Sequence, residues 1–280
     1  MTEFTELAPP TEPRIHSPRD VPGIPRVLVP PPSPAQYSFG PMKAMLIFGL
    51  YVLAQFAGGF LVLVGISIRE VLRGGNPVGA AFADTIMREA TAPLLVISLL
   101  LSAVVVFIAT LLLAWPLFAE HGFGGLGWNA SSGSWRGFAI ATGLTLALVW
   151  ILITREFPLA PGSALGPLAK MAAQAGLQRG AWALVAFFFA PITEEFLFRG
   201  VLFAGFARRL GIVAAAVIVT ALFVALHLFE TLAYLPAAIA VTTMATIAIL
   251  LRIRSGSLLP SILVHATYNL TVVAGVYLSH

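Results

Sequence analysis

The chain has 280 residues, of which only 28 are charged, 16 basic and 12 acidic. Charged residues make up 10% of the chain, against about 25% in an ordinary soluble domain, and apolar residues make up 59%. A soluble protein of this size needs more polar side chains to cover its surface. The composition therefore excludes a soluble enzyme, a disordered protein and a nucleic-acid-binding protein, and it predicts a membrane protein with several spans.

The absence of cysteine narrows the possible chemistry further. Without cysteine there can be no disulfide, no thiolate nucleophile and no cysteine-ligated zinc. The net charge of +4 does not require an acidic partner, because membrane proteins retain lysine and arginine in their cytoplasmic loops. We therefore expect the lipid bilayer, and no nucleic acid, as a partner of the chain.

The first 41 residues form a segment of their own, with 11 of the 20 prolines of the chain. Several acidic and basic residues are scattered among these prolines. Such a segment cannot bury enough apolar surface to fold. We predict a proline-rich, disordered cytoplasmic tail at 1–41 and a transmembrane helical domain at 42–280.

After the tail, apolar segments recur at lengths of about 17–27 residues, close to the roughly 20 that an α-helix needs to cross the hydrocarbon core. The predicted spans are Met45–Ile68, Ala92–Phe118, Gly137–Ile153, Ala181–Phe206, Ile212–Phe229, Leu232–Leu251 and Leu258–Leu278. The connections at 69–89 and 156–179 are long enough to contain one more membrane-embedded piece. The predicted fold is an all-α, polytopic transmembrane helical bundle with seven or eight spans.

The basic residues of the loops indicate the orientation of the chain. With a cytoplasmic N-terminus, nine basic residues lie on the cytoplasmic side and six on the other. The short loops late in the chain show a clearer bias, because the external ones contain no basic residue. The cytoplasmic ones contain Arg208, Arg209, Arg252 and Arg254. Basic charge is normally retained on cytoplasmic loops, so we predict a cytoplasmic N-terminus.

Ionisable side chains inside the predicted spans are few, and they gather in the last third of the chain. The interiors of the first three spans contain no Asp, Glu, Lys, Arg or His. The later spans contain Glu194, Glu195, Arg199, His227 and His265. Ionisable groups are costly in the hydrocarbon region and mark functional sites there. We therefore place a catalytic core at about 181–278.

Helical spacing suggests which of these residues interact. Glu195 and Arg199 lie one turn apart on one helix face, with the acid before the base, which favours an ion pair. Glu194 is rotated by about 100° from Glu195, and it has no cation one turn away. Glu194 is therefore the uncompensated carboxylate of this span. His265 and Asn269 also share a helix face.

If these helix faces converge, one cavity holds a carboxylate, two imidazoles and a carboxamide, which is a set suited to hydrolysis. Glu194 and His227 would then hold and deprotonate a water molecule. His265 and Asn269 would donate hydrogen bonds to the oxyanion that forms. Alternatively, Glu194, His227 and His265 would bind zinc and leave a fourth coordination position open. The sequence contains no His-Glu-x-x-His, which excludes the usual type of zincin.

The depth of these residues in the membrane tests their convergence. At 1.5 Å per residue, Glu194 lies about 21 Å from Arg208 and His227 lies about 22 Å from Ile212. By the same count, His265 lies only about 11–14 Å from the start of its span. Convergence therefore requires either a tilted seventh span or a displaced helix start.

Three short motifs in these spans resemble those of a known family. They are Glu194-Glu195-x-x-x-Arg199, Phe223-x-x-x-His227 and His265-x-x-x-Asn269. Their order, and the placement of each in an apolar span, resemble the CPBP family, also called the Abi family, of CAAX proteases and bacteriocin-processing enzymes. This family includes the Ras-converting CAAX endoprotease. The resemblance covers about Ala181–Tyr277.

The resemblance implies an intramembrane endopeptidase that acts on a membrane-associated protein or peptide. Carried over from the family, water activation falls on Glu194 and His227, and the oxyanion site falls on His265 and Asn269. The supporting ion pair is Glu195–Arg199. Both a metal-dependent mechanism, with zinc, and a metal-free, glutamate-dependent mechanism are implied. Eukaryotic relatives cleave prenylated CAAX proteins and many bacterial relatives have other substrates, and we expect a bacterial plasma membrane protein.

A membrane carrier is the alternative function. Embedded Glu and His also mark ion pathways, so Glu194 and His227 could form the relay of a proton-coupled transporter. A proton relay, however, needs no oxyanion donor such as the pair His265 and Asn269. The sequence also shows no inverted repeat of broken helices, which many carriers have. A catalytically inactive scaffold or immunity protein is the remaining possibility. These features favour the protease.

Overall fold

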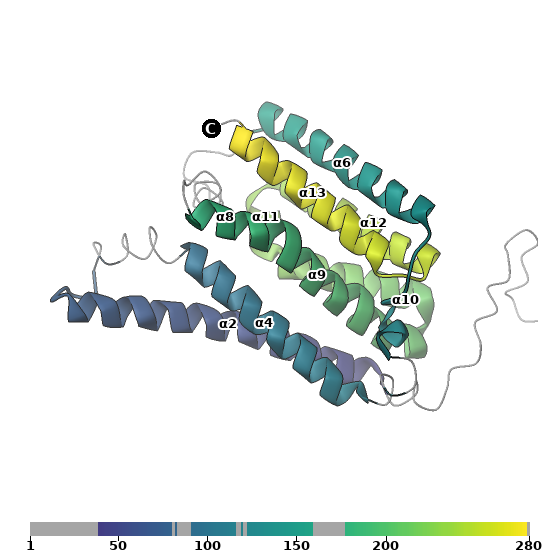
Figure 1. Ribbon diagram of the computed structural model, residues 1–280, viewed down its shortest axis with the longest axis horizontal. Helices are drawn as coiled ribbons and strands as arrows, with labels where there is room; N and C mark the ends of the chain where they lie inside the picture. The colour runs from purple at the N-terminus through teal and green to yellow at the C-terminus, as the bar shows by residue number, and fades with distance from the viewer. Residues whose placement is uncertain are drawn as a thin grey trace, which may run out of the picture. The chain divides into compact units, whose positions relative to one another are not determined.

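The computed structural model describes residues 39–79, 82, 91–115, 119, 122–158 and 177–278. Within these ranges every regular element is a helix (Figure 1). The elements are α2 (Pro41–Leu72), α4 (Thr91–Leu113), η1 (Gly122–Leu126), α6 (Gly133–Glu156), α8 (Leu177–Leu184), η2 (Val185–Phe189), α9 (Ala190–Glu195), η3 (Phe196–Leu202), α10 (Phe203–Leu226), α11 (Leu228–Ala233), α12 (Leu235–Ser255) and α13 (Leu259–Leu278). The all-helical prediction is confirmed.

Among the described residues, six helices are long and apolar enough to cross a membrane. The longest, Trp182–Leu226, has 45 residues and contains two of the predicted spans. It is interrupted at Gly211, where φ is 81° and ψ is 166°. A residue without a Cβ adopts this conformation without steric cost. The seven predicted spans therefore each correspond to a helical segment, and the long helix consists of two of them.

The predicted tail lies almost entirely outside the described residues, as do most of the connections in which we expected an eighth membrane-embedded piece. The structure does place the last residues of the predicted tail. Phe39 is fully buried, and Arg208 Nη1 donates a hydrogen bond to its carbonyl oxygen at 3.2 Å. Pro41 then begins α2, at the helix position where proline costs least. Within the described residues, Phe39 therefore packs with the helical domain.

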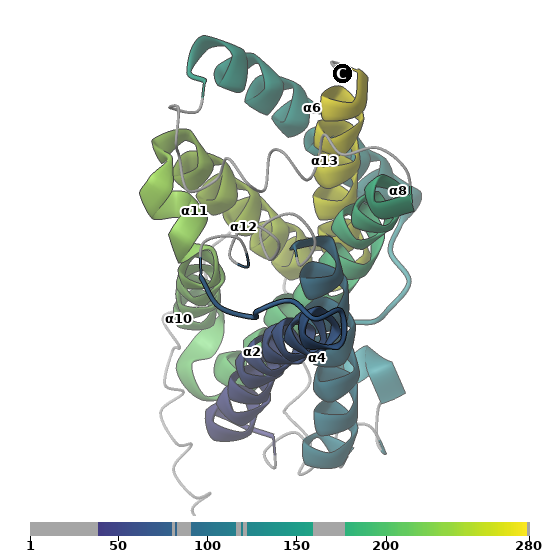
Figure 2. The ribbon, with the colours of Figure 1, turned by 90° about the vertical axis from the view of Figure 1, so that its left-hand side faces the viewer.

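Helix α9 lies between two groups of helices (Figure 1). It contacts α4 on one side and α13 on the other, while α2 packs along α4 and α6 packs along α13. Figure 2 shows α10, α11 and α12 following one another along the side of these helices. Residues of α9 are therefore surrounded by helices from both halves of the chain.

Small residues allow two of the helix pairs to approach closely. A Cβ added at Gly58 of α2 would lie 2.5 Å from the Cα of Ser98 in α4. A Cβ added at Gly143 of α6 would lie 2.5 Å from the carbonyl oxygen of Val264 in α13. Such close backbone contacts are typical of helices that pack inside a bilayer, where apolar side chains gain little by leaving lipid.

Large apolar side chains also cover the outward faces of the helices. Phe56 and Phe60 of α2 are exposed, as are Val213 and Val217 of α10. A soluble protein of this size does not expose apolar surface on so many long helices. These faces fit a hydrocarbon environment, and the protein is an integral membrane protein.

The helical segment around α9 departs from regular α-helix on both sides. Val185–Phe189 and Phe196–Leu202 are π-helical, and the six-residue α9 lies between them. π-helical turns are rare and are found mostly at functional sites, because the wider turn changes the direction of the side chains that follow it. The two predicted glutamates are the last two residues of α9.

Candidate active site

Glu194, His227, His265 and Asn269 line one cavity of about 190 Å³. Glu194 comes from α9, His227 lies between α10 and α11, and the other two come from α13. The remaining walls are Phe223, Ala240, Val241, Met244 and Tyr268. The polar positions of all three motifs therefore meet, although they are spread over 76 residues of sequence.

Glu195 and Arg199 lie behind this cavity and are fully buried. Glu195 Oε1 lies 3.2 Å from Arg199 Nη1. Arg199 Nη2 donates a second hydrogen bond, at 2.9 Å, to the carbonyl oxygen of Ala245 in α12. The guanidinium carbon also lies 4.5 Å from the centre of the Phe223 ring, which is a cation–π contact. Arg199 thus connects the first motif to α12 and to the second motif.

His265 bridges the two glutamates. Its Nδ1 lies 2.9 Å from Glu195 Oε1, and its Nε2 lies 4.0 Å from Glu194 Oε2. A carboxylate oxygen only accepts hydrogen bonds, so Nδ1 carries the proton in this contact. Glu195 Oε1 is therefore shared by Arg199 and His265, which the sequence did not indicate.

The shallow position of His265 along its own helix is explained by the turn that precedes α13. Arg252, near the end of α12, donates from Nε to the carbonyl oxygen of Arg199 at 3.2 Å. The turn between α12 and α13 therefore lies close to the level of Arg199, one helical turn from Glu195. Leu258 N donates to the Gly127 carbonyl oxygen at 2.7 Å, which holds the start of α13 there. Of the two explanations considered, a tilted span and a displaced helix start, these hydrogen bonds support the displaced start of α13.

His227 is oriented by Phe223, the other residue of the second motif. Its Nδ1 lies 3.0 Å from the Phe223 carbonyl oxygen, and its ring stacks on the Phe223 ring with centroids 4.7 Å apart. Because a carbonyl only accepts, Nδ1 is the donor and Nε2 of the neutral ring keeps a lone pair. The Phe223 ring lies between the imidazole of His227 and the guanidinium of Arg199.

Asn269 connects α13 to the π-helical segment before α9. Its Nδ2 donates a hydrogen bond to the carbonyl oxygen of Ala186 at 2.7 Å. A carboxamide nitrogen has two hydrogens, so one remains for another acceptor.

Two tyrosines near the cavity were missed by the sequence analysis. Tyr268 lines the cavity itself. Tyr51, a fully buried residue of α2, lies near enough to Glu194 for an electrostatic interaction. Tyrosine is uncharged near neutral pH, so it does not stand out in an apolar span as an ionisable residue does. The spacing of Tyr268, three residues after His265 and hence on the same helix face, was the available signal.

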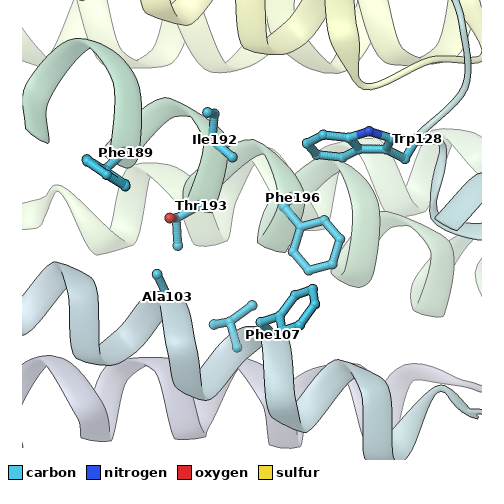
Figure 3. Close-up of a pocket in the computed structure, with 8 residues that line it drawn as sticks. Ala103, Phe107, Trp128, Phe189, Ile192, Thr193 and Phe196 are labelled. Atoms are coloured by element: carbon cyan, nitrogen blue, oxygen red, sulfur yellow. The ribbon is translucent and has the colours of Figure 1, made fainter. Parts of the chain in front are cut away.

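A larger, apolar pocket lies on the other side of the same helical segment. It has a volume of about 450 Å³ and lies between α4 and α9. Figure 3 shows Phe189, Ile192, Thr193 and Phe196 opposite Ala103 and Phe107, with Trp128 at one end. Thr193 immediately precedes Glu194, so the apolar pocket and the polar cavity lie on either side of one turn of α9.

The residues of the predicted zinc site can be tested against this geometry. In the part of the chain that the structure describes, no group of three or more His, Cys, Asp or Glu side chains lies close enough together to hold a metal ion. The set Glu194, His227 and His265 is therefore not arranged as a zinc site here, and zinc binding stays a prediction for measurement.

Comparison with known proteins gives one match. Residues 177–271 match the family described as Type II CAAX prenyl endopeptidase Rce1-like. The match covers about a third of the chain and includes all six predicted site residues. No curated protein and no solved structure matches the chain. This match over residues 177–271, from α8 to near the end of α13, supports the CAAX protease family that the three motifs resemble.

Proposed function

We propose that the protein is an intramembrane endopeptidase that hydrolyses a peptide bond of a membrane-associated protein or peptide. The observation that carries this proposal is the shared cavity of Glu194, His227, His265 and Asn269. A carboxylate, two imidazoles and a carboxamide around one cavity supply a general base and hydrogen-bond donors. The family match supports the same class of activity.

Water activation is the role of Glu194 and His227. Nε2 of neutral His227 has a lone pair, because its Nδ1 donates to the Phe223 carbonyl oxygen. Glu194 has a carboxylate at the same cavity. The two groups hold a water molecule and take its proton as its oxygen attacks the carbonyl carbon of the substrate. The proton then passes to the nitrogen of the leaving amine.

The oxyanion of the tetrahedral intermediate is stabilised by His265 and Asn269. Asn269 has one amide hydrogen beyond the one given to Ala186. Nε2 of His265 lies 4.0 Å from Glu194 Oε2, and it donates to the oxyanion when both ring nitrogens are protonated. Glu195 and Arg199 act as the buried support, holding His265 and Phe223 in place.

The substrate binds from the membrane side, with an apolar part in the pocket between α4 and α9. This pocket lies one residue of α9 away from the catalytic carboxylate. Its walls are aromatic and aliphatic side chains, which suit hydrocarbon and offer few polar partners. A membrane-associated substrate can therefore keep its apolar part in this pocket while its peptide bond reaches Glu194.

The orientation that we propose has the N-terminus in the cytoplasm, in a bacterial plasma membrane. The start of α2 contacts Arg208, through the carbonyl oxygen of Phe39. Arg252 lies at the end of α12, over the ring of Phe203, five residues before Arg208. The first described residues therefore lie at the end of the protein where basic side chains gather, as the usual distribution of basic residues requires for a cytoplasmic N-terminus.

Purified protein in detergent tests this function with quenched fluorescent peptides. One peptide ends in a prenylated Cys-Ala-Ala-X sequence, one lacks the prenyl group, and one is an apolar transmembrane peptide. We expect cleavage of at least one, abolished by Glu194→Gln and by His227→Ala. Glu230→Gln is the matched control, since Glu230 lies in α11 and outside the cavity.

A proton-coupled transporter gives the opposite pattern. Protein reconstituted in vesicles would then move protons in a Glu194-dependent manner and cleave none of the three peptides. Full cleavage by either the Glu194 or the His227 variant would overturn the proposed mechanism.

A further inference from the structure

We infer that Tyr268 is a further catalytic residue, whose hydroxyl donates a hydrogen bond to the oxyanion of the tetrahedral intermediate. This inference rests on the proposed endopeptidase function. Tyr268 lines the same cavity as Glu194, His227 and Asn269. Among the described residues that line the cavity, it is the one polar side chain that the three motifs leave without a role.

The position of Tyr268 on α13 explains why it reaches the cavity. It follows His265 by three residues and precedes Asn269 by one, so the three side chains leave the helix on neighbouring faces. The half-buried ring packs against the apolar core of the protein. A side chain with few rotamers, packed in this way, can hold its hydroxyl in a fixed position at little entropic cost.

The backbone of Tyr268 is also held tightly, by the approach of α6 to α13. A Cβ added at Gly143 of α6 would lie 3.2 Å from the Tyr268 nitrogen and 3.0 Å from Thr267 Cβ. The two helices are therefore in backbone contact at this level. A donor in a preformed position is what oxyanion stabilisation requires, because it need not reorganise during the reaction.

Each of the other candidate donors already makes one hydrogen bond to the protein, and Asn269 keeps one amide hydrogen. Asn269 Nδ2 donates to Ala186, His265 Nδ1 to Glu195, and His227 Nδ1 to Phe223. In their neutral forms the two histidines thus have no further N–H for the oxyanion. Within the described ranges the Tyr268 hydroxyl makes no hydrogen bond to the protein. With the remaining amide hydrogen of Asn269, it therefore gives the oxyanion two neutral donors that need no protonated histidine.

In the proposed reaction Tyr268 donates a hydrogen bond and transfers no proton, so all bonds and protons are accounted for without it. The water oxygen bonds to the carbonyl carbon, its proton goes to Glu194 or His227, and the carbonyl π electrons move to oxygen. That oxygen accepts the hydrogen bond of the Tyr268 O–H, which stays protonated throughout. The intermediate then collapses, the C–N bond breaks, and the nitrogen takes the proton from Glu194 or His227.

Tyr268→Phe tests the inference, because it removes the hydroxyl and keeps the ring. We expect kcat to fall by about 10²-fold, the scale for loss of one oxyanion donor, with KM changed by less than about twofold. The apparent melting temperature in detergent should stay the same, since the hydroxyl has no protein partner to lose. Tyr277→Phe, on the same helix with its ring beside Trp182, is the matched control and should retain full activity.

Two inhibitors built on the cleaved peptide separate this role from a structural one. A phosphinate peptide has a tetrahedral centre with a negatively charged oxygen, whereas a reduced-amide peptide has no oxygen at that position. Tyr268→Phe should weaken binding of the phosphinate by about the factor lost in kcat/KM and leave the reduced amide unchanged. Equal weakening of both inhibitors, or an unchanged kcat, would overturn the inference.

The outcomes also separate this inference from the proposed function. If the wild-type protein cleaves and Glu194→Gln does not, full activity of Tyr268→Phe refutes the role of Tyr268 alone. If the wild-type protein cleaves no peptide, both the function and the role of Tyr268 fail together.

Discussion

His265 donates from Nδ1 to Glu195 Oε1 at 2.9 Å, although the two residues are 70 positions apart in the sequence. The same oxygen accepts from Arg199 at 3.2 Å. Glu195 therefore neutralises the buried arginine of its own helix and also orients the histidine of the third motif. The ion pair that helical spacing predicted is part of a larger network, which includes a cavity-lining residue.

Glu195→Gln should lower stability more than chemistry. The substitution leaves the fully buried guanidinium of Arg199 without a compensating charge, which costs about 3–5 kcal/mol when one partner of a buried pair is removed. We expect a lower yield and a lower apparent melting temperature in detergent. Turnover per folded molecule should fall less than in Glu194→Gln.

The double variant Glu195→Gln/Arg199→Gln is the control, because it removes both charges. It should recover part of the lost stability. A normal yield of Glu195→Gln combined with a selective loss of turnover would instead assign the base role to Glu195.

Phe223→Leu should reduce activity by misplacing His227. The Phe223 ring stacks on the imidazole at 4.7 Å and lies 4.5 Å from the guanidinium carbon of Arg199. Leucine keeps the helix and the carbonyl acceptor but removes both ring contacts. We expect kcat to fall by about tenfold, since small displacements of a catalytic group are costly.

Phe48→Leu is the matched control for this variant. Its ring packs edge-on against Phe198 at 5.8 Å and lies outside the catalytic cavity. It should reduce stability through lost packing and leave kcat near the wild-type value. Equal losses of kcat in the two variants would indicate a general packing effect.

Ala103→Phe should obstruct the apolar pocket between α4 and α9. Ala103 faces Thr193 across this pocket (Figure 3), so a phenyl ring there occupies space that we assign to the apolar part of the substrate. We expect KM for a lipid-modified peptide to rise about tenfold or more, and KM for a short unmodified peptide to change little.

Val104→Phe provides the comparison, because Val104 is the next residue, is 54% exposed and lies outside this pocket. It should have no effect on either peptide. An unchanged KM for the lipid-modified peptide in Ala103→Phe would show that the substrate does not use this pocket.

Elemental analysis of purified protein should show less than stoichiometric zinc. Among the residues that the structure describes, no three suitable side chains converge on one point, and three protein ligands are the usual minimum for catalytic zinc. Cleavage should accordingly be insensitive to a chelator. One zinc per chain that is lost in both His227→Ala and His265→Ala would contradict this expectation and support the zinc alternative.

The sequence alone determined the class of protein, the helical segments and the set of motif residues. Hydropathy locates spans because the bilayer has a fixed thickness, and each predicted span contains a helix. Intramembrane ionisable groups are rare enough to mark a site. The spacing of Glu195 and Arg199 was sufficient to predict their ion pair, because a helix fixes the geometry of positions four residues apart.

The tertiary structure decided which of these residues contact one another. The bond from Glu195 to His265, the Phe223 ring between Arg199 and His227, and the place of Tyr268 all depend on how separate helices pack. Hydropathy and helical period describe one helix at a time, so they contain no information on such contacts. The scarcity of charge, 28 charged residues in 280, identified a membrane protein. Helix packing brought one of the three intramembrane charges, Glu194, to the cavity and buried the other two, Glu195 and Arg199, behind it.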